Sequence, residues 1–183
     1  VVFEVKVSDS DIAAANQALV DVYDEFATTE NMKSFLLANS DRAYDEGWYK
    51  AGELNTVAAV VNDYAFSNNA SVSEVLSNGN TFYAVRVMES AMVPDSVYVK
   101  YVPSTVENVD SLLNVAEPMW ITQVPGYEAV MTAAKNSKVT VNGLVFNVLD
   151  RTAPVAKKKV AVLEKTAVAS KETVNGYYAQ ANT

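Results

Sequence analysis

Residues 78–88 have the sequence Asn-Gly-Asn-Thr-Phe-Tyr-Ala-Val-Arg-Val-Met. An Asn-Gly pair followed by alternating side chains is typical of a turn that leads into a β-strand. The pattern predicts a strand at 81–88 with two distinct faces. One face carries Phe82, Ala84 and Arg86, and the other carries Tyr83, Val85 and Val87.

The patterns around this strand occur in the same order twice along the chain. Each half begins with a strand pattern, continues through helical patterns and a tryptophan-containing loop, and ends with a strand. The halves are 1–91 and 95–152, and the second is shorter. Because each half combines helices with strands, we predict an α+β fold in which the first and last strands of each half pair antiparallel. The expected pairs are 3–7 with 81–87, and 97–102 with 144–149.

Three helix starts carry serine at the position that caps a helix. Ser8 precedes Asp11 by three residues and Ser104 precedes Glu107 by three, which is the spacing of a capping box. Ser170 is placed to cap a final helix. Before it, Val-rich residues 158–163 predict a strand, and the adjacent run Lys157-Lys158-Lys159 is interpreted as that strand's solvent-facing side.

The composition excludes several classes of function. The 183 residues include 14 basic and 22 acidic side chains, a net charge of −8, so the clustered positive surface that nucleic acids require is not expected. The chain has no cysteine and no histidine. Thiol nucleophiles, Ser-His-Asp triads and Cys- or His-ligated zinc are therefore excluded, and we expect no cofactor.

The loop at 41–53 gathers carboxylates, namely Asp41, Asp45, Glu46 and Glu53. Such a group suggests a cation site, but the spacing of a calcium-binding loop is missing. A solvated acidic loop is the preferred interpretation, and a glycosidase pair is a minor alternative.

The first half resembles the parvulin family of peptidyl-prolyl isomerases. Residues 45–54, Asp-Glu-Gly-Trp-Tyr-Lys-Ala-Gly-Glu-Leu, are similar to the family's acidic-glycine-aromatic loop, and Ser40-Asp41 is similar to the residues before it. Residues 61–66 stand where the family's next helix ends. Residues 71–75 resemble the following link, and residues 82–87 resemble the last strand.

The second half resembles the same family more distantly. The resemblance lies in residues 94–102, Met119-Trp120-Ile121, residues 125–130 and residues 143–148. It implies a parvulin-like unit at 1–91 and a degenerate, truncated one at 95–152. Residues 153–183 then resemble the connecting strand and helix start that lead to a further unit in membrane-anchored periplasmic isomerases and chaperones of the SurA/PpiD type.

The resemblance fails at the residues that the family uses for catalysis. Parvulin active sites contain one histidine on the first strand and one on the last. In the second half, those positions correspond to Tyr101 and Leu144. In the first half, the first-strand position falls near Glu4 and the last-strand position is Tyr83. None of these side chains can replace imidazole, so we expect no catalytic residues and no isomerase activity.

The expected function is therefore that of an internal fragment of an extracytoplasmic, periplasmic folding factor. It would bind or scaffold unfolded or proline-containing polypeptide, with an inner-membrane anchor outside these residues. Two alternatives remain open. One is an active isomerase whose catalytic unit lies outside the fragment, and the other is a structural spacer or dimerisation module.

Two groups of residues are candidates for polypeptide binding. Trp48, Tyr49, Phe66 and Tyr83 are the hypothetical lining of a peptide groove, although Trp48 is equally suited to closing the core. Met88, Met92, Tyr98 and Tyr101 form a possible apolar patch near the junction of the two halves, with internal packing as the alternative.

Overall fold

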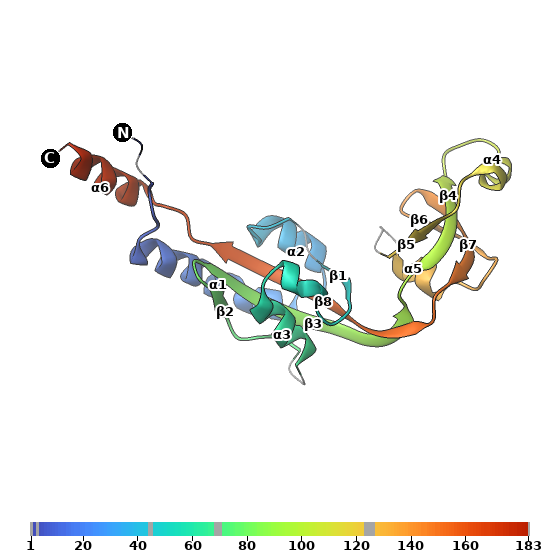
Figure 1. Cartoon of the computed structure of the whole chain (residues 1–183), viewed down its shortest axis with the longest axis horizontal. Coiled ribbons are helices and arrows are strands. Elements are labelled where there is room, and N and C mark those ends of the chain that lie inside the picture. The colour runs from blue at the N-terminus through green and yellow to red at the C-terminus, as the bar shows by residue number, and fades with distance from the viewer. Residues whose placement is uncertain (1, 3, 44–45, 68–70, 123–126, 183) are drawn as a thin grey trace. The chain divides into compact units, whose positions relative to one another are not determined.

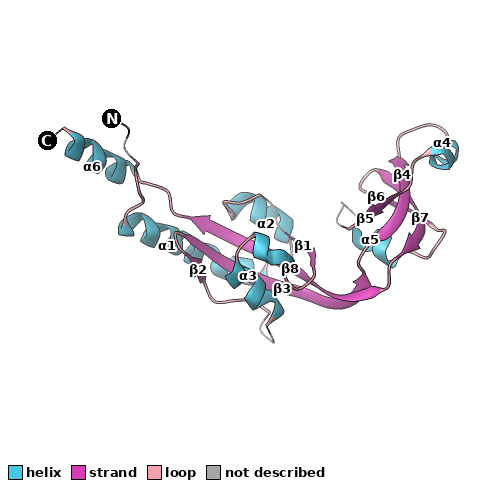
Figure 2. Ribbon diagram, in the orientation of Figure 1, coloured by secondary structure: helices cyan, strands magenta, loops and turns pink. Residues whose placement is uncertain are grey.

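The computed structural model describes residues 2, 4–43, 46–67, 71–122 and 127–182. The chain is α+β and divides into two compact units, each with its own four-stranded antiparallel sheet (Figures 1 and 2). Unit 1 contains residues 1–90 and 158–183, and unit 2 contains residues 91–157. Asp45 of the acidic loop lies outside the described residues, as do Phe3 in the predicted strand at 3–7 and Pro125 and Gly126 in the motif at 125–130.

Unit 1 is a sheet with helices on both faces. Its strands lie in the order β1-β8-β3-β2, so β8 and β3 are central. The residues of its elements are α1 (Asp9–Thr28), α2 (Met32–Asn39), β1 (Glu46–Tyr49), the 3₁₀ helix η1 (Glu53–Thr56), α3 (Ala59–Phe66), β2 (Leu76–Asn78), β3 (Thr81–Pro94), β8 (Pro154–Thr166) and α6 (Lys171–Ala181).

Alternation along the central strands separates two apolar clusters. Phe82 and Ala84 of β3 pack with Ala161 and Leu163 of β8 against α1 and α2. The intervening side chains, including Tyr83, pack under η1 and α3 on the opposite face. Both faces of β3 and β8 are thus covered, which explains their nearly continuous apolar sequences.

Unit 2 is a smaller sheet with two short helices. Its strands lie in the order β5-β4-β7-β6. The elements are β4 (Val97–Pro103), α4 (Val109–Val115), β5 (Met119–Ile121), α5 (Tyr127–Thr132), β6 (Lys138–Val141) and β7 (Leu144–Arg151). The predicted pairing of 97–102 with 144–149 is confirmed, because β4 and β7 are antiparallel neighbours. The chain turns at Asn142-Gly143 between β6 and β7, and both residues have the positive φ that such a tight turn uses.

The predicted strand at 3–7 is wrong. Residues 4–8 are not in a strand, and the place beside β3 belongs to β8. Thr166 ends β8 next to Thr81 at the start of β3, with their hydroxyl oxygens 3.3 Å apart. The segment at 153–183 is therefore not simply a connection to a further unit. From Lys158 onward it belongs to unit 1, and unit 2 is inserted between the two central strands of unit 1.

The three consecutive lysines do not form a solvent-facing strand side. The Lys157 side chain is 2% exposed, and its Nζ lies 3.3 Å from Asp95 Oδ1. Lys158 Nζ donates to the carbonyl oxygen of Ala65 at the end of α3, and Lys159 pairs with Glu46. Each ammonium group is satisfied by an acceptor from a different element, as buried or half-buried charges require.

Candidate functional site

The structure does not bring the four predicted groove residues together. Trp48 and Tyr49 lie in β1, Phe66 ends α3, and Tyr83 lies in β3. Trp48 is the cross-strand partner of Lys159, which alternation places on the face covered by α1 and α2. Tyr49, Phe66 and Tyr83 instead belong to the apolar cluster on the α3 face.

Burial further argues against an open groove at these residues. Trp48 and Tyr83 are each 5% exposed. Tyr83 packs among Val85, Val160 and Val162, where η1 and α3 cover the sheet. The α3 face of unit 1 is a filled core, and Trp48 closes the opposite face.

The chemistry of Tyr83 follows from this burial. Removal of the phenol from water raises its pKa above the usual value near 10, and the negative charge of Glu164 raises it further, while Arg42 opposes the effect. The phenol is therefore neutral at physiological pH. It can donate a hydrogen bond, but it cannot serve as a general base there.

The residues beside Tyr83 are also unsuited to acid-base chemistry. The strand next to β3 is β8, which contributes Val160 and Val162 to the apolar cluster on the α3 face. Glu4, near which the resemblance places the catalytic position of the first strand, is exposed and lies outside the sheet. Glu164 of β8, whose charge acts on Tyr83, is itself paired with Arg42 at 3.2 Å.

The acidic loop is engaged in internal contacts. Asp41 accepts a hydrogen bond from the amide of Thr166, and Glu53 accepts one from the amide of Lys50. Glu46 pairs with Lys159 at 3.6 Å. Within the described ranges, no three acidic residues are grouped so that they could hold a metal ion.

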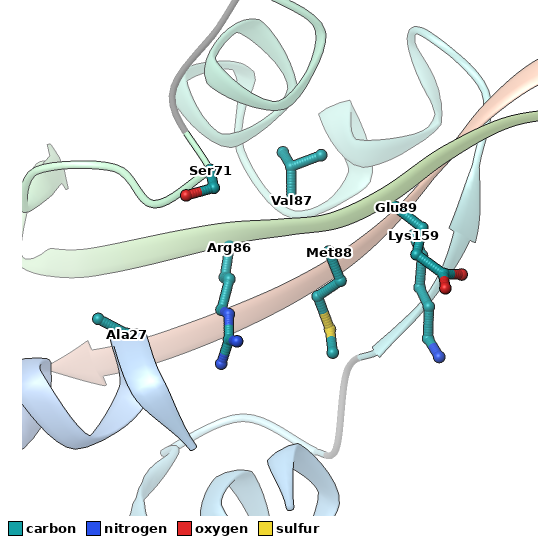
Figure 3. A pocket seen from close by; sticks show the side chains of 7 residues that line it. All are labelled: Ala27, Ser71, Arg86, Val87, Met88, Glu89 and Lys159. Carbon is teal, nitrogen blue, oxygen red and sulfur yellow. The ribbon is translucent and has the colours of Figure 1, made fainter. Parts of the chain in front are cut away.

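A hollow of about 300 Å³ lies on β3 near the end of α1 (Figure 3). Arg86, Met88 and Lys159 point into the space between the strands and the helices. The Arg86 guanidinium donates to the carbonyl oxygens of Phe26 and Thr29, at 3.2 and 2.8 Å. Because these carbonyls end α1, Arg86 acts as a C-terminal cap, and the hollow is interpreted as structural.

Unit 2 exposes an aromatic pair. Tyr98 and Trp120 are cross-strand partners in β4 and β5, and their ring centroids are 4.9 Å apart. Trp120 is 51% exposed, and β5 is an edge strand. The sequence placed Trp120 in a loop, because a three-residue strand gives almost no periodic signal.

A second apolar surface of unit 2 is a groove of about 580 Å³. It is called the methionine groove here, and its lining is Met92, Val93, Pro94, Met131, Thr132, Arg151, Thr152 and Pro154. The sequence singled out Met92 as part of an apolar patch. However, Met88 of that patch packs against the core of unit 1. No local pattern in the sequence indicates that Met131 and Arg151 would join Met92.

Comparison with known proteins identifies no relative: no protein-family model, no curated protein and no solved structure matches the chain. None of the helices in the described part of the chain is long and apolar enough to cross a membrane. The function is therefore argued from the residues and the fold of this chain.

Proposed function

We propose that this chain is a non-catalytic part of an extracytoplasmic folding factor related to the parvulins, and that it binds unfolded polypeptide. The order of elements in unit 1 carries the proposal. Helices α1 and α2 are followed by β1 with Gly47-Trp48, then α3, a link, and the long strand β3. From the helices onward, this order agrees with the sequence resemblance, which otherwise rests on short motifs. The first strand that the resemblance implies is absent from residues 4–8, and β8 lies beside β3 instead.

The proposed absence of catalysis rests on the face that carries Tyr83. Prolyl isomerisation has a barrier of about 20 kcal/mol, and an enzyme must twist and desolvate the imide to lower it. Here, Val160, Val162 and the α3 residues fill the space over the sheet. A proline ring has no room to enter without displacing part of the core.

The proposed binding activity rests on unit 2. Large exposed apolar patches on soluble proteins commonly mark interaction sites. Trp120 and Met92 are 51% and 66% exposed, and each lies on a surface with further apolar side chains. Aromatic rings and methionine are well suited to varied partners, because they supply apolar area and adapt their shape.

The first test concerns catalysis. In a protease-coupled assay with a proline-containing tetrapeptide, the chain should leave cis-trans exchange at its uncatalysed time of tens of seconds. A clear acceleration that disappears in Tyr83→Phe would contradict the proposal, since it would give the Tyr83 phenol a role in the reaction. The Tyr98→Phe variant is the matched control, because it removes a phenol from unit 2.

The second test concerns binding. An unfolded polypeptide should bind with a dissociation constant in the micromolar range, about −8 kcal/mol. A change in the fluorescence of Trp120, measured in a Trp48→Phe background, would place the polypeptide at β5. Binding without a change at Trp120 would move the site away from β5. No binding at millimolar concentration would contradict the proposal and favour a spacer or a dimerisation module. Sedimentation analysis would distinguish these two, because only the second forms dimers.

A further inference from the structure

We propose that the methionine groove of unit 2 selects extended apolar segments that carry a carboxylate, which pairs with Arg151. This inference rests on the proposed polypeptide-binding function and names the kind of segment that it prefers. The groove is built from four separate parts of unit 2: the end of β3, helix α5, the end of β7 and the start of β8.

The groove has a rigid floor. Val93 is 7% exposed and Met131 is 4% exposed, so both are fixed by packing. The backbone at the rim is fixed as well, because the amide of Ser96 donates to Thr152 Oγ1 and the amide of Thr152 donates to the Ser96 carbonyl, both at 3.0 Å. A preformed site binds more tightly, since less ordering is needed when the ligand arrives.

The wall of the groove is adaptable. Met92 is 66% exposed and lines the same groove as the buried Met131. A thioether chain with three rotatable bonds can cover leucine, phenylalanine or methionine side chains of a partner without one fixed shape. The volume of about 580 Å³ is within the range of sites that hold small molecules or a few side chains.

Arg151 gives this apolar site a charge preference. Its backbone amide donates to Asp150 Oδ1, and Asp150 pairs with Lys135 at 3.8 Å. Across the part of the chain that the structure describes, no acidic side chain pairs with the Arg151 guanidinium. A planar guanidinium at the edge of an apolar surface is well suited to bidentate binding of a carboxylate.

The charge of the whole chain makes this cation selective. The net charge of −8 repels acidic segments from the chain as a whole. The attraction between Arg151 and a carboxylate therefore favours binding of an acidic, apolar segment at this groove. The preferred ligand is an extended peptide with two apolar residues followed closely by aspartate or glutamate.

The experiment uses the full chain and two labelled nonapeptides that differ only in one aspartate, replaced by asparagine in the second. Fluorescence anisotropy at low salt should show about fivefold tighter binding of the acidic peptide, as expected for an exposed charge pair. Arg151→Gln should remove this difference and leave the asparagine peptide unchanged. Lys138→Gln, which removes an exposed cation from β6, is the matched control and should keep the difference.

Two further variants locate the apolar contact. Met92→Ser should weaken both peptides about tenfold, whereas Met119→Ser on β5 should have little effect. The reverse result would place the peptide at Tyr98 and Trp120 and overturn this inference. Equal weakening of both peptides by Arg151→Gln would also overturn it.

Two controls separate this inference from the proposed function. Circular dichroism and thermal unfolding check that each variant is folded. If unfolded polypeptide binds but Arg151→Gln and Met92→Ser change nothing, only the inference about the groove fails. If neither the peptides nor unfolded polypeptide bind the original chain, the proposed function fails with it.

Discussion

Replacing Asp11 with asparagine should lower the midpoint of thermal unfolding of unit 1 by roughly 5 °C, since two helix caps are damaged together. Asp11 is 5% exposed and lies in the first turn of α1. Its Oδ2 accepts hydrogen bonds from the Ser8 amide and the Thr173 hydroxyl, at 2.9 and 2.7 Å. Its Oδ1 accepts one from the Ser170 amide at 3.0 Å. An asparagine amide would turn a donor toward one of these donors.

The effect should depend on pH. The hydrogen bond from the Ser8 backbone, followed by that from Thr173, lowers the pKa of Asp11 well below its usual range, while partial burial opposes the shift. A carboxyl whose folded pKa is lowered stabilises the fold above its unfolded pKa, near 4. This stability is lost as pH falls from about 4 toward the folded pKa. The difference between the original chain and Asp11→Asn should therefore be constant from pH 5 to 7 and shrink below pH 4.

Asp9 supplies the matched control for this experiment. It also lies in the first turn of α1 but is exposed, so Asp9→Asn makes the same change in charge without the buried contacts. An equal loss of stability in both variants would reduce the role of Asp11 to an interaction with the helix dipole. Each unit contains one tryptophan, Trp48 or Trp120, so single-tryptophan backgrounds report each unfolding transition separately.

Replacing Lys157 with methionine should destabilise unit 2 by about 2–3 kcal/mol. Methionine keeps the aliphatic stem but removes the ammonium group, which donates to the Asp95 carbonyl at 3.1 Å and lies 3.3 Å from its carboxylate. Removing one partner of a buried ion pair costs roughly 3–5 kcal/mol. The value here is smaller because the Asp95 side chain is 33% exposed, and water can solvate its charge.

Denaturant unfolding followed at Trp120 measures this loss. Lys135→Met is the control, because the Lys135 side chain is 61% exposed and pairs with Asp150 only at 3.8 Å. The double variant Lys157→Met with Asp95→Asn should recover part of the lost stability, since no unpaired carboxylate remains. A double variant that is less stable than Lys157→Met alone would show that Asp95 acts through other contacts.

Local signals in the sequence predicted much of the secondary structure. Ser8 and Asp11 form the capping box that their spacing predicts, and Ser170 caps α6. The capping box at Ser104 and Glu107 does not form. The amide of Ser104 donates to the Gly143 carbonyl, and α4 begins later, after Asn108. The pairing of β4 with β7 continues to Pro103, and Ser104 follows it directly, so Ser104 lies at the end of a strand and not at the start of a helix.

Long-range pairing could not be predicted from the same signals. Residues 1–7 alternate apolar and polar side chains, and residues 160–163 form a short apolar run. Both patterns are typical of strands, so either segment could lie beside β3. The choice depends on which segment buries more apolar area. Ala161 and Leu163 of β8 are completely buried on one face, and Val160 and Val162 on the other. In contrast, Val5 at the N-terminal end is 38% exposed.

The faces on which the predicted groove residues lie could not be assigned from the sequence for a related reason. Sequence spacing identified Trp48, Tyr49 and Tyr83 as aromatic residues near a sheet, but adjacent residues of a strand point to opposite faces. Without the register of β1 against β8, the face of each ring could not be assigned. Predicting the methionine groove requires still more long-range information, because its lining comes from three separate stretches of the chain, at 92–94, 131–132 and 151–154.

The insertion of unit 2 between β3 and β8 affects how the chain can fold. Thr81 and Thr166 meet in the sheet of unit 1 although they are 85 positions apart. Closing a loop costs entropy that grows by about 0.6 kcal/mol for each doubling of its length. The contacts of Ser96 with Thr152 and of Asp95 with Lys157 hold the two ends of unit 2 together. Once unit 2 has folded, the effective loop between the central strands of unit 1 is only a few residues long. We therefore expect folding of unit 2 to promote closure of the unit 1 sheet, so that slowing the folding of unit 2 should delay the closure of unit 1.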